Sequence, residues 1–594
     1  MARGGRVSDG SALEGLDEQQ LEAVTTLRGP VCVLAGAGTG KTRVITRRIA
    51  HGVDTGAYSP GRVMAVTFTA KAAGEMRGRL RALGVQGVAA RTFHSAALAQ
   101  LNFFWPSVAG DAAPGIVDNK VRLLAHAADG LRMDLDRATL RDVAAEIEWR
   151  KVTMRSIDQY AQARPGGVGE LDGLAVVHLQ RAYEALKDER RQLDFEDVLL
   201  ACAGMLEAEP RVAQAVREQY RHFTVDEFQD VSPLQYRLLE LWLGDRRDIC
   251  VVGDASQTIY SFAGADARYL LEFERRHEGA KVVRLERNHR SDAPVLAVAN
   301  SLMRGRPGAL NLVSDRPAGD APTPSVAVFS DDEDEARGVA RAIAAQIAAG
   351  VDPRAIAVLY RARSQSPELL RALADEQVAT SVLGGTRFFD MPEVRQAVMA
   401  LRAAAVAPLE TTFREAVRDV LRSLGLTDEP PPAGGAVRDA WEARAAILRL
   451  ADEAAPGATL RTFADELVAR AKAQDEPGMR TVTLATLHAA KGLEWDHVHL
   501  VGMSEGLLPI AYATTFEQVD EERRLAYVGI TRAARTLSLS WSRGRGRAER
   551  QASRFLREIG SGSLRAADAR ATRAAATRST ATGSARPGAP SRVR

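Results

Sequence analysis

Short apolar runs alternate with amphipathic stretches along most of this chain. In the first half the apolar runs are VCVLAG (31–36), VMAVTFT (63–69), VAARTFH (88–94), HFTVDEF (222–228) and DICVVGD (248–254). After the first run, KTRVITRRIA (41–50) carries its apolar residues at helical spacing. Strands that alternate with helices in this way predict an α/β fold with a doubly wound parallel sheet.

A second series of apolar runs predicts a second α/β core. Its members are KVVRLERN (281–288), PSVAVFS (324–330), AIAVLYR (355–361), TVTLATLH (481–488), HVHLVGM (497–503) and LSLSWS (537–542). A mostly helical stretch interrupts each series, so we expect two cores with one helical insert apiece. The expected segments are a disordered N-terminus (1–15), core 1 (16–104 and 194–280), insert 1 (105–193), core 2 (281–385 and 480–560), insert 2 (386–479) and a disordered basic tail (561–594).

Composition narrows the protein class without pointing to an activity. Hydrophobic residues make up 46% of the chain, yet no apolar stretch approaches membrane-spanning length. The N-terminus lacks the apolar core of a signal peptide. The three cysteines are far apart and form no C-x-x-C pair, which argues against a disulfide framework or a cysteine zinc site. We therefore expect a cytoplasmic protein with its cysteines in the core.

The net charge of +3 conceals an uneven distribution. Residues 561–594 contain seven Arg and one Asp, a net +6, which leaves −3 for the rest of the chain. This tail contains too few large apolar residues to form a core, so we expect it to be disordered. A disordered cationic segment is typical of nucleic-acid binding. The alternative is a solubilising terminus without a partner.

The segment AGAGTGKT (35–42) has the pattern of a phosphate-binding loop. It matches G-x-x-x-x-G-K-[ST] except at its first position, which is Ala35. The backbone N–H groups of such a loop, together with the N-terminus of the following helix, bind phosphate oxygens. Lys41 would then reach the terminal phosphates and the Thr42 hydroxyl would hold Mg²⁺. The alternative is a glycine-rich turn between a core strand and a helix.

An acidic pair follows another apolar run. VDEFQD (225–230) places Asp226 and Glu227 at the end of a predicted strand. In a P-loop enzyme, one acid at this place holds magnesium and its neighbour orients or deprotonates the attacking water. Acidic pairs are common on surfaces, so the position after a strand is what makes this pair a candidate site.

The segment VVGDASQTIYSF (251–262) also ends a strand in polar and aromatic residues. Gln257 is a candidate sensor of a terminal phosphate, and Tyr260 and Phe262 are candidate platforms on which nucleic-acid bases stack. Burial in an aromatic core is the alternative for both rings.

Two arginines come from the second predicted core. LERNHRSDAP (285–294) supplies Arg290 and YVGITRAAR (527–535) supplies Arg532. Arginines from a second core neutralise charge that develops on a γ-phosphate, as arginine fingers do. Surface salt bridges are the alternative for each.

Taken in order, these segments resemble the UvrD/Rep/PcrA group of superfamily 1 DNA helicases. The resemblance covers roughly residues 16–560. It rests on LDEQQLEAV, AGAGTGKTR, VTFTAKAAGEM, TFHS, DFEDVLL, VDEFQD, VVGDASQTIYSFAGAD, LERNHRS, GGTRFFDMPEV, VTLATLHAAKGLEWDHVHLVG and EERRLAYVGITRAA. The resemblance implies two RecA-like P-loop NTPase cores and an ATP- and Mg²⁺-dependent 3′→5′ motor. The motor would act on single-stranded DNA and its junctions with duplex, in DNA repair or replication, which implies association with the nucleoid.

The resemblance also implies a role for individual residues. The expected nucleotide-binding residues are Gln20, Gly36, Ala37, Gly38, Thr39, Gly40, Lys41, Thr42, Arg43, His289 and Glu494, with Gln20 on adenine, Arg43 and His289 on its two faces, and Glu494 on ribose. Thr42 and Asp226 are the expected magnesium ligands, and Glu227 the catalytic base. Gln257, Arg290 and Arg532 are expected to contact the γ-phosphate. The expected DNA-path residues are Phe68, His94, Tyr260, Phe262 and His488.

Several positions depart from the family pattern. His289 stands where the family has tyrosine, so it stacks less broadly and is titratable. FAGA replaces WRGA, which gives Phe262 a smaller face and puts Ala263 where a cation is usual, and Ala70 replaces asparagine in TFTAK. Insert 2 is much shorter than in the family, and we find no duplex-contacting Gly-x-Gly motif in it.

Three functional hypotheses remain open at this stage. The first is an ATP-driven 3′→5′ DNA helicase and translocase. The second is a DNA-dependent ATPase that strips or remodels protein–DNA complexes with little duplex unwinding, as the short insert suggests. The third, a helicase–nuclease subunit, requires an appended nuclease domain where this sequence has a basic tail. Pathway, oligomeric state and protein partners have no sequence signal.

Overall fold

The computed structural model describes residues 12–317, 319, 321–383, 388–405, 411–429, 436–452, 454, 457–473, 480–544 and 549–566 of the 594-residue chain. The described residues form two compact units. The first lies within residues 1–289 and 305–312, and the second within 290–304 and 313–594.

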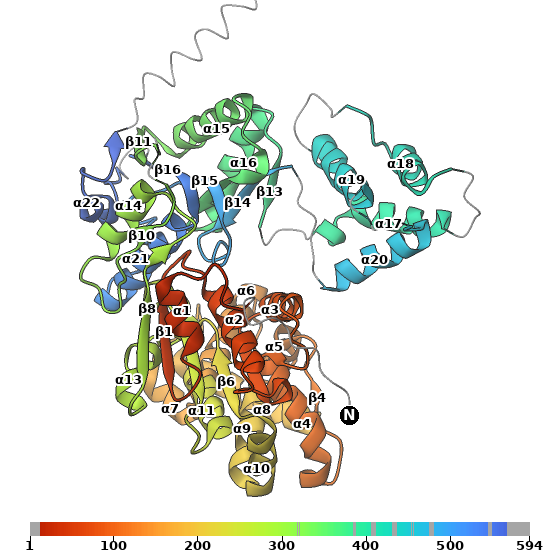
Figure 1. The fold of residues 1–594 in the computed structure, drawn as a ribbon, viewed down its shortest axis with the longest axis vertical. Coiled ribbons are helices and arrows are strands. Elements are labelled where there is room, and N and C mark those ends of the chain that lie inside the picture. The colour runs from red at the N-terminus through yellow and green to blue at the C-terminus, as the bar shows by residue number, and fades with distance from the viewer. Residues whose placement is uncertain are drawn as a thin grey trace, which may run out of the picture. The chain divides into compact units, whose positions relative to one another are not determined.

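A six-stranded parallel sheet in the order β3-β2-β6-β7-β1-β8 forms the centre of the first unit (Figure 1). Its strands are β1 (Val31–Ala35), β2 (Val63–Thr67), β3 (Ala89–Thr92), β6 (His222–Val225), β7 (Ile249–Gly253) and β8 (Lys281–Leu285), and β9 (Arg287–Asn288) follows. The helices of this core are α1 (Glu18–Thr25), α2 (Lys41–Asp54), α3 (Ala70–Ala82), α4 (Phe93–Ala109), α9 (Phe195–Ala208), α10 (Pro210–Gln219), α11 (Pro233–Leu243), α12 (Arg268–Leu271) and α13 (Phe273–Arg276). The α/β prediction is confirmed.

The central strands are buried on both faces, as expected for a parallel sheet covered by helices. Met64 and Val66 of β2 pack into one apolar cluster, whereas Val63 and Ala65 pack into another. This alternation follows from the period of two in a β-strand. The three cysteines are reduced and buried, as the sequence predicts, and burial raises the pKa of the Cys202 thiol to about 12.

The boundary expected at residue 281 is wrong. The strand of KVVRLERN, β8, pairs in parallel with β1 and completes the first sheet, with Val31 opposite Lys281 and Ala35 opposite Leu285. An apolar run predicts a strand but not the sheet it joins, because the pairing partner lies far away in sequence.

Two terminal segments are also more ordered than expected. Ala12 is buried, and the carbonyl oxygens of Ala12 and Glu14 accept hydrogen bonds from Arg47. At the other end, β17 (Arg565–Ala566) pairs with β11 through Ser325 and Val326. The rest of the predicted disordered segments, 1–11 and 567–594, lies outside the described residues.

Insert 1 is a helical subdomain of the first unit. It contains α5 (Lys120–Gly130), α6 (Arg137–Val152), α7 (Ile157–Ala163) and α8 (Gly173–Glu189), with the short strands β4 (Gly115–Ile116) and β5 (Gln192–Leu193). Its apolar core lies between α5, α6 and α8. Helix α4 runs on to Ala109, so it crosses the boundary expected at residue 104.

Buried ion pairs join this insert to α9 of the core. Lys151 Nζ of α6 lies 2.7 Å from Asp194 Oδ2 and 2.7 Å from Asp197 Oδ1 at the start of α9, and 3.0 Å from Glu184 Oε1 of α8. Lys187 also pairs with Glu184 and Asp197. Burial alone would raise the pKa of Asp194, but the surrounding lysines outweigh it and hold that pKa below its usual range. The network fixes insert 1 on the core.

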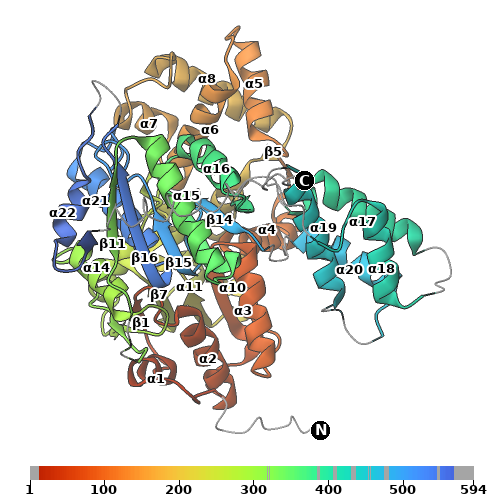
Figure 2. The same cartoon turned by 90° about the horizontal axis from the view of Figure 1, so that it is seen from above.

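A seven-stranded sheet in the order β13-β14-β12-β15-β16-β11-β17 forms the centre of the second unit. Its other strands are β11 (Ser325–Phe329), β12 (Ile356–Tyr360), β13 (Thr380–Val382), β14 (Val482–Thr486), β15 (Trp495–Leu500) and β16 (Ala533–Ser542). The remaining elements are β10 (Val313–Ser314), α14 (Ala293–Met303), α15 (Asp332–Ala348), α16 (Ser366–Asp375), α21 (Phe516–Ile530) and α22 (Arg554–Ile559). Figure 2 shows α15 and α16 side by side, and their apolar faces share a buried cluster with β12 and β14.

Insert 2 is a small helical bundle with a core of its own. Its helices are α17 (Pro392–Ala404), α18 (Phe413–Ser423), α19 (Ala436–Asp452) and α20 (Leu460–Ala473) (Figure 1). Val394, Val417, Ile447 and Leu467, one from each helix, are fully buried among them.

We predict that Lys151→Ala lowers the free energy of unfolding of the first unit by about 3–5 kcal/mol. The substitution leaves buried carboxylates without their central cation, which is the costly way to break a buried ion pair. Denaturant titration followed by circular dichroism measures the effect. Lys281→Ala is the control, because the Lys281–Glu22 pair is half exposed and should contribute less than about 1 kcal/mol. Equal effects of the two substitutions would show that the network does not hold the insert.

Candidate active site

The loop between β1 and α2 has the geometry of an anion-binding nest. Gly38 and Gly40 have φ of +70° and +86°, in the left-handed region that favours glycine. Thr39 Oγ1 donates to Gly36 O at 2.9 Å, which closes the loop on itself. The loop ends at the N-terminus of the 14-residue helix α2, where backbone N–H groups and the helix dipole favour a negative ligand.

The ammonium group of Lys41 is buried without a hydrogen-bond acceptor among the described residues. Lys41 Nζ lies 3.6 Å from Glu227 Oε2. A buried ammonium without hydrogen bonds is costly. Terminal phosphate oxygens supply the acceptors this group lacks, so these residues fit a nucleoside triphosphate.

Asp226 and Glu227 follow β6 at the same edge of the sheet. Burial, reinforced by the neighbouring Glu227 carboxylate, raises the pKa of Asp226 to about 7, although Lys41 acts in the opposite direction. A divalent cation would stabilise the ionised form of this carboxyl. Magnesium binds through one or two carboxylates plus water and phosphate, so Asp226 and the hydroxyl of Thr42, in the first turn of α2, fit such an ion.

Glu227 is held in an unusual backbone conformation. Its φ of +51° and ψ of +39° are left-handed, which costs free energy for a residue other than glycine. Gln229 Nε2 donates to Glu227 Oε2 at 2.5 Å, and Gln229 Oε1 accepts from the backbone N–H of Asp254 at 2.9 Å. Gly253 leaves room for this amide, because a Cβ there would lie 2.6 Å from Gln229 Oε1. Gln229 therefore ties the end of β6 to the end of β7.

Sequence reasoning did not assign Gln229 a role, although VDEFQD contains it. The available signal was an amide side chain, Gln229, two residues after the candidate base and within the same motif. Gln257, which we did select, lies in the 3₁₀ turn Ala255–Gln257 and donates from Nε2 to Asp254 Oδ2 at 2.7 Å. Both amides are buried, and each is hydrogen-bonded to Asp254, which therefore links Gln229 to Gln257.

The residues expected around adenine meet at the other side of the loop. Gln20 is fully buried and its Nε2 donates to Thr39 O at 2.9 Å. His289 Nε2 lies 3.2 Å from Gln20 Nε2 and 3.0 Å from Asp17 Oδ2. Arg43 Nη2 donates to Gly15 O at 2.7 Å. The structure thus brings Gln20 and His289 together, through the ring nitrogen of His289.

The second unit carries three of the predicted nucleotide contacts close to one another. Arg290 Nε lies 2.6 Å from Glu494 Oε2, and Arg290 Nη1 donates to Thr531 O at 3.2 Å. Arg532 is buried and donates to Val528 O at 2.9 Å and to Leu493 O at 3.0 Å. The alternative of a surface salt bridge therefore does not fit Arg532, which is buried. It does fit Arg290, which pairs with Glu494.

Two aromatic groups in the first unit contain residues that the sequence analysis expects on the nucleic-acid path. Tyr260 and Phe262 have ring centroids 6.2 Å apart, and Phe262 is 64% exposed. His94 stacks on Phe195 with centroids 3.9 Å apart and planes at 17°. Phe195 is 57% exposed and was missed by sequence reasoning, although it stands in the quoted segment DFEDVLL. An aromatic residue this exposed is available for stacking.

The remaining predicted path residues contribute no positive charge at neutral pH. Phe68 is partly buried against Phe93, with ring centroids 6.1 Å apart. Burial, with Lys120 nearby, lowers the pKa of His94 to about 4. In the second unit, burial with Arg361 and Lys491 lowers the pKa of His488 to about 4. Both imidazoles are thus neutral at pH 7.

Comparison with known families agrees with this arrangement. Residues 16–278 match the model of the UvrD/REP helicase N-terminal domain. Residues 283–426 and 451–544 match the model of the UvrD-like helicase C-terminal domain. The chain belongs to the UvrD-like helicase family.

Several members of the UvrD-like family match nearly the whole chain. The ATP-dependent DNA helicase UvrD2 of Mycobacterium tuberculosis is 46% identical over 575 residues, covering 92% of this chain and 82% of the relative. The ATP-dependent DNA helicase Rep of Escherichia coli is 30% identical, covering 92% and 94%. The ATP-dependent DNA helicase PcrA of Leuconostoc citreum is 30% identical, covering 93% and 86%. In the described part of this chain, no helix is long and apolar enough to cross a membrane.

We predict that Gln229→Ala lowers the rate of ATP turnover by roughly 10²-fold with little change in ATP affinity. The substitution removes the hydrogen bond that orients the Glu227 carboxylate and the one that joins Gln229 to the backbone of Asp254. A misplacement of about 1 Å at a reacting group has this order of effect. Steady-state ATPase assays and nucleotide titration separate the two quantities. Gln214→Ala, on the exposed face of α10, is the control. Wild-type turnover in Gln229→Ala would refute the positioning role.

Proposed function

We propose that the protein is an ATP-dependent helicase and translocase that moves 3′→5′ on single-stranded DNA. The observation that carries the proposal is the buried Lys41 ammonium beside Glu227. Along the chain, the neighbouring strand β7 is followed by the Tyr260–Phe262 pair, which is the proposed base-stacking platform. A phosphate-loop lysine next to a candidate base supports nucleoside triphosphate hydrolysis. An exposed aromatic pair supports binding of unpaired bases.

Each residue contributes a distinct step in this proposal. The loop Gly36–Gly40 and Lys41 bind the phosphates, and Gln20 reads the adenine edge between Arg43 and His289. Glu227 accepts a proton from the attacking water, and Gln229 keeps its carboxylate oriented for this. Thr42 and Asp226 would hold a magnesium ion, which would supply neutralisation of the phosphate charge.

The remaining proposed roles concern two arginines of the second unit and Gln257 of the first. Arg290 and Arg532 stabilise the charge that develops on the transferred phosphoryl group, with Glu494 exchanging its pairing with Arg290 for the ribose. Gln257 contacts the terminal phosphate and lies three residues before Tyr260, so loss of that phosphate shifts the segment that holds the DNA bases. His94, Phe68 and Phe195 extend the path in the first unit, and His488 extends it in the second.

The substitution Glu227→Gln tests the catalytic assignment. We expect ATP binding near the wild-type level and turnover lower by ~10²–10⁴, the range for a positioned acid–base group. Nucleotide titration and ATPase assays give the two readings. Glu240→Gln, an exposed glutamate of α11, controls for the loss of one negative charge. Hydrolysis by Glu227→Gln within a few-fold of wild type would remove Glu227 from the mechanism.

A second candidate function is a motor that strips proteins from DNA and unwinds duplex weakly. Insert 2 favours it, because this segment is shorter than the family pattern and contains no Gly-x-Gly motif for duplex contact. We expect the protein to displace a protein bound to single-stranded DNA while it separates a 3′-tailed duplex slowly. Displacement of streptavidin from a biotinylated strand and unwinding of the tailed duplex are the two assays. Fast unwinding without displacement would favour the helicase alone.

A further inference from the structure

The proposed base-stacking platform carries no charge of its own. From Tyr260 to Ala265 the sequence is Tyr-Ser-Phe-Ala-Gly-Ala, and the histidine of the path in the same unit is neutral at pH 7. Phosphate contacts supply a large part of the affinity of proteins for nucleic acids. A strand that stacks on Phe262 therefore needs a cation from a neighbouring segment.

The end of helix α6 packs directly on this platform loop. Gly264 has a φ of +90°, and a Cβ there would lie 2.5 Å from Val152 Cγ2 and 3.7 Å from Thr153 Cγ2. Glycine is thus required for both the turn and the close approach. The 3₁₀ turn Ser261–Ala263, which contains Phe262, and the segment that follows α6 in insert 1 are adjacent parts of one surface.

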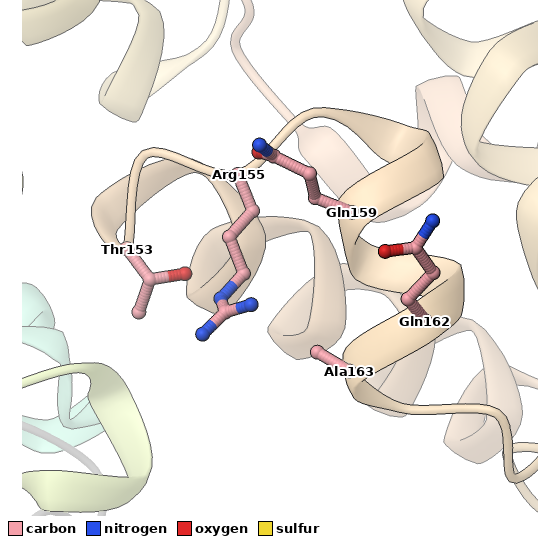
Figure 3. Close-up of a pocket in the computed structure, with 5 residues that line it drawn as sticks. All are labelled: Thr153, Arg155, Gln159, Gln162 and Ala163. Carbon is pink, nitrogen blue, oxygen red and sulfur yellow. The ribbon is translucent and has the colours of Figure 1, made fainter.

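An open polar pocket begins at this junction. It has a volume of about 490 Å³ and is lined by Thr153, Arg155, Gln159, Gln162 and Ala163 (Figure 3). In Figure 3 the Arg155 side chain extends toward the side of Thr153 and Ala163, while the amides of Gln159 and Gln162 point in other directions. No carboxylate lines the pocket, so its charged group is a single guanidinium.

Arg155 is held by stacking rather than by an ion pair. Its guanidinium lies over the ring of Trp149, 5.4 Å from the centroid, and Arg164 lies over the same ring at 3.8 Å. Arg164 pairs with Glu146, whereas no ion pair joins Arg155 to a carboxylate among the described residues. A guanidinium carries its N–H donors in a planar fork that matches phosphate, and a cation–π contact leaves these donors available.

We propose that this pocket is a phosphate subsite for the single DNA strand held by Phe262, with Arg155 as its cation. The inference rests on the proposed DNA-binding function and adds a contact from insert 1. The Gln159 and Gln162 amides supply further donors, and the Trp149 ring contacts the guanidinium. The ligand is a phosphodiester of the strand, next to the base that stacks on Phe262.

The test compares two exposed arginines of the same insert. Arg155→Ala removes the proposed contact, whereas Arg141→Ala removes an equal charge from near the start of α6, roughly 16 Å along the helix from its end. Affinity for an oligo(dT) strand is measured by fluorescence anisotropy over a series of salt concentrations. Thermal denaturation of each variant verifies folding.

We expect Arg155→Ala to weaken binding about threefold or more at low salt. The slope of log affinity against log salt should fall by about 0.7, the value for one phosphate contact on a single strand. Arg155→Lys should retain the slope, because its charge still displaces a counterion. Arg141→Ala should match wild type. In a Phe262→Ala background the effect of Arg155→Ala should shrink, since both side chains act on the same stretch of strand.

Three results would overturn the inference. An unchanged slope in Arg155→Ala would show that Arg155 contacts no phosphate. An equal loss of oligo(dT) affinity in Arg141→Ala would show a general charge effect. An equal effect of Arg155→Ala with and without Phe262 would show that the pocket and the platform do not act on the same stretch of strand. Absence of oligo(dT) binding by the wild-type protein would overturn the proposed function as well, whereas normal wild-type binding confines a negative result to the pocket.

Discussion

The proposed catalytic edge of the first sheet is held by two hydrogen bonds of the Gln229 side chain, one to Glu227 and one from Asp254. One fixes the carboxylate of Glu227 and the other fixes the backbone at Asp254. Because β6 and β7 are parallel neighbours, their carboxyl ends meet at one edge, and a single amide spans the gap between them. The left-handed backbone of Glu227 persists because its surroundings constrain it in this way.

This link places nucleotide chemistry and DNA contact on one short segment. Asp254 receives the hydrogen bond of Gln257, and Tyr260 and Phe262 follow within eight residues of Asp254. The turn that carries Phe262 then packs against the end of α6, so insert 1 contacts the same segment. Ion pairs around Lys151 keep that insert on α9, whose first residue, Phe195, stacks on His94. We therefore propose that loss of the terminal phosphate shifts the segment from Gln257 to Phe262 and so alters the contacts of this segment with DNA.

Local patterns in the sequence predicted the chemistry better than they predicted the boundaries. The phosphate loop, the acidic pair and the platform are read from consecutive residues, because each works through its own backbone geometry. Membership of β8 in the first sheet and of β17 in the second depends on pairing with distant strands, which no local pattern encodes. Gln229 and the buried lysines were missed for a related reason: their roles arise from partners brought together only by folding.

The decisive measurement is the rate of ATP hydrolysis by the full chain with and without oligo(dT), because it reports whether DNA contact is coupled to Glu227. If the aromatic platform and Glu227 are coupled through the segment from Asp254 to Phe262, saturating single strand raises the rate strongly. The same stimulation should be lost in Phe262→Ala at oligo(dT) concentrations that saturate the wild type. A rate that is independent of single-stranded DNA, with both ligands bound, would contradict the account.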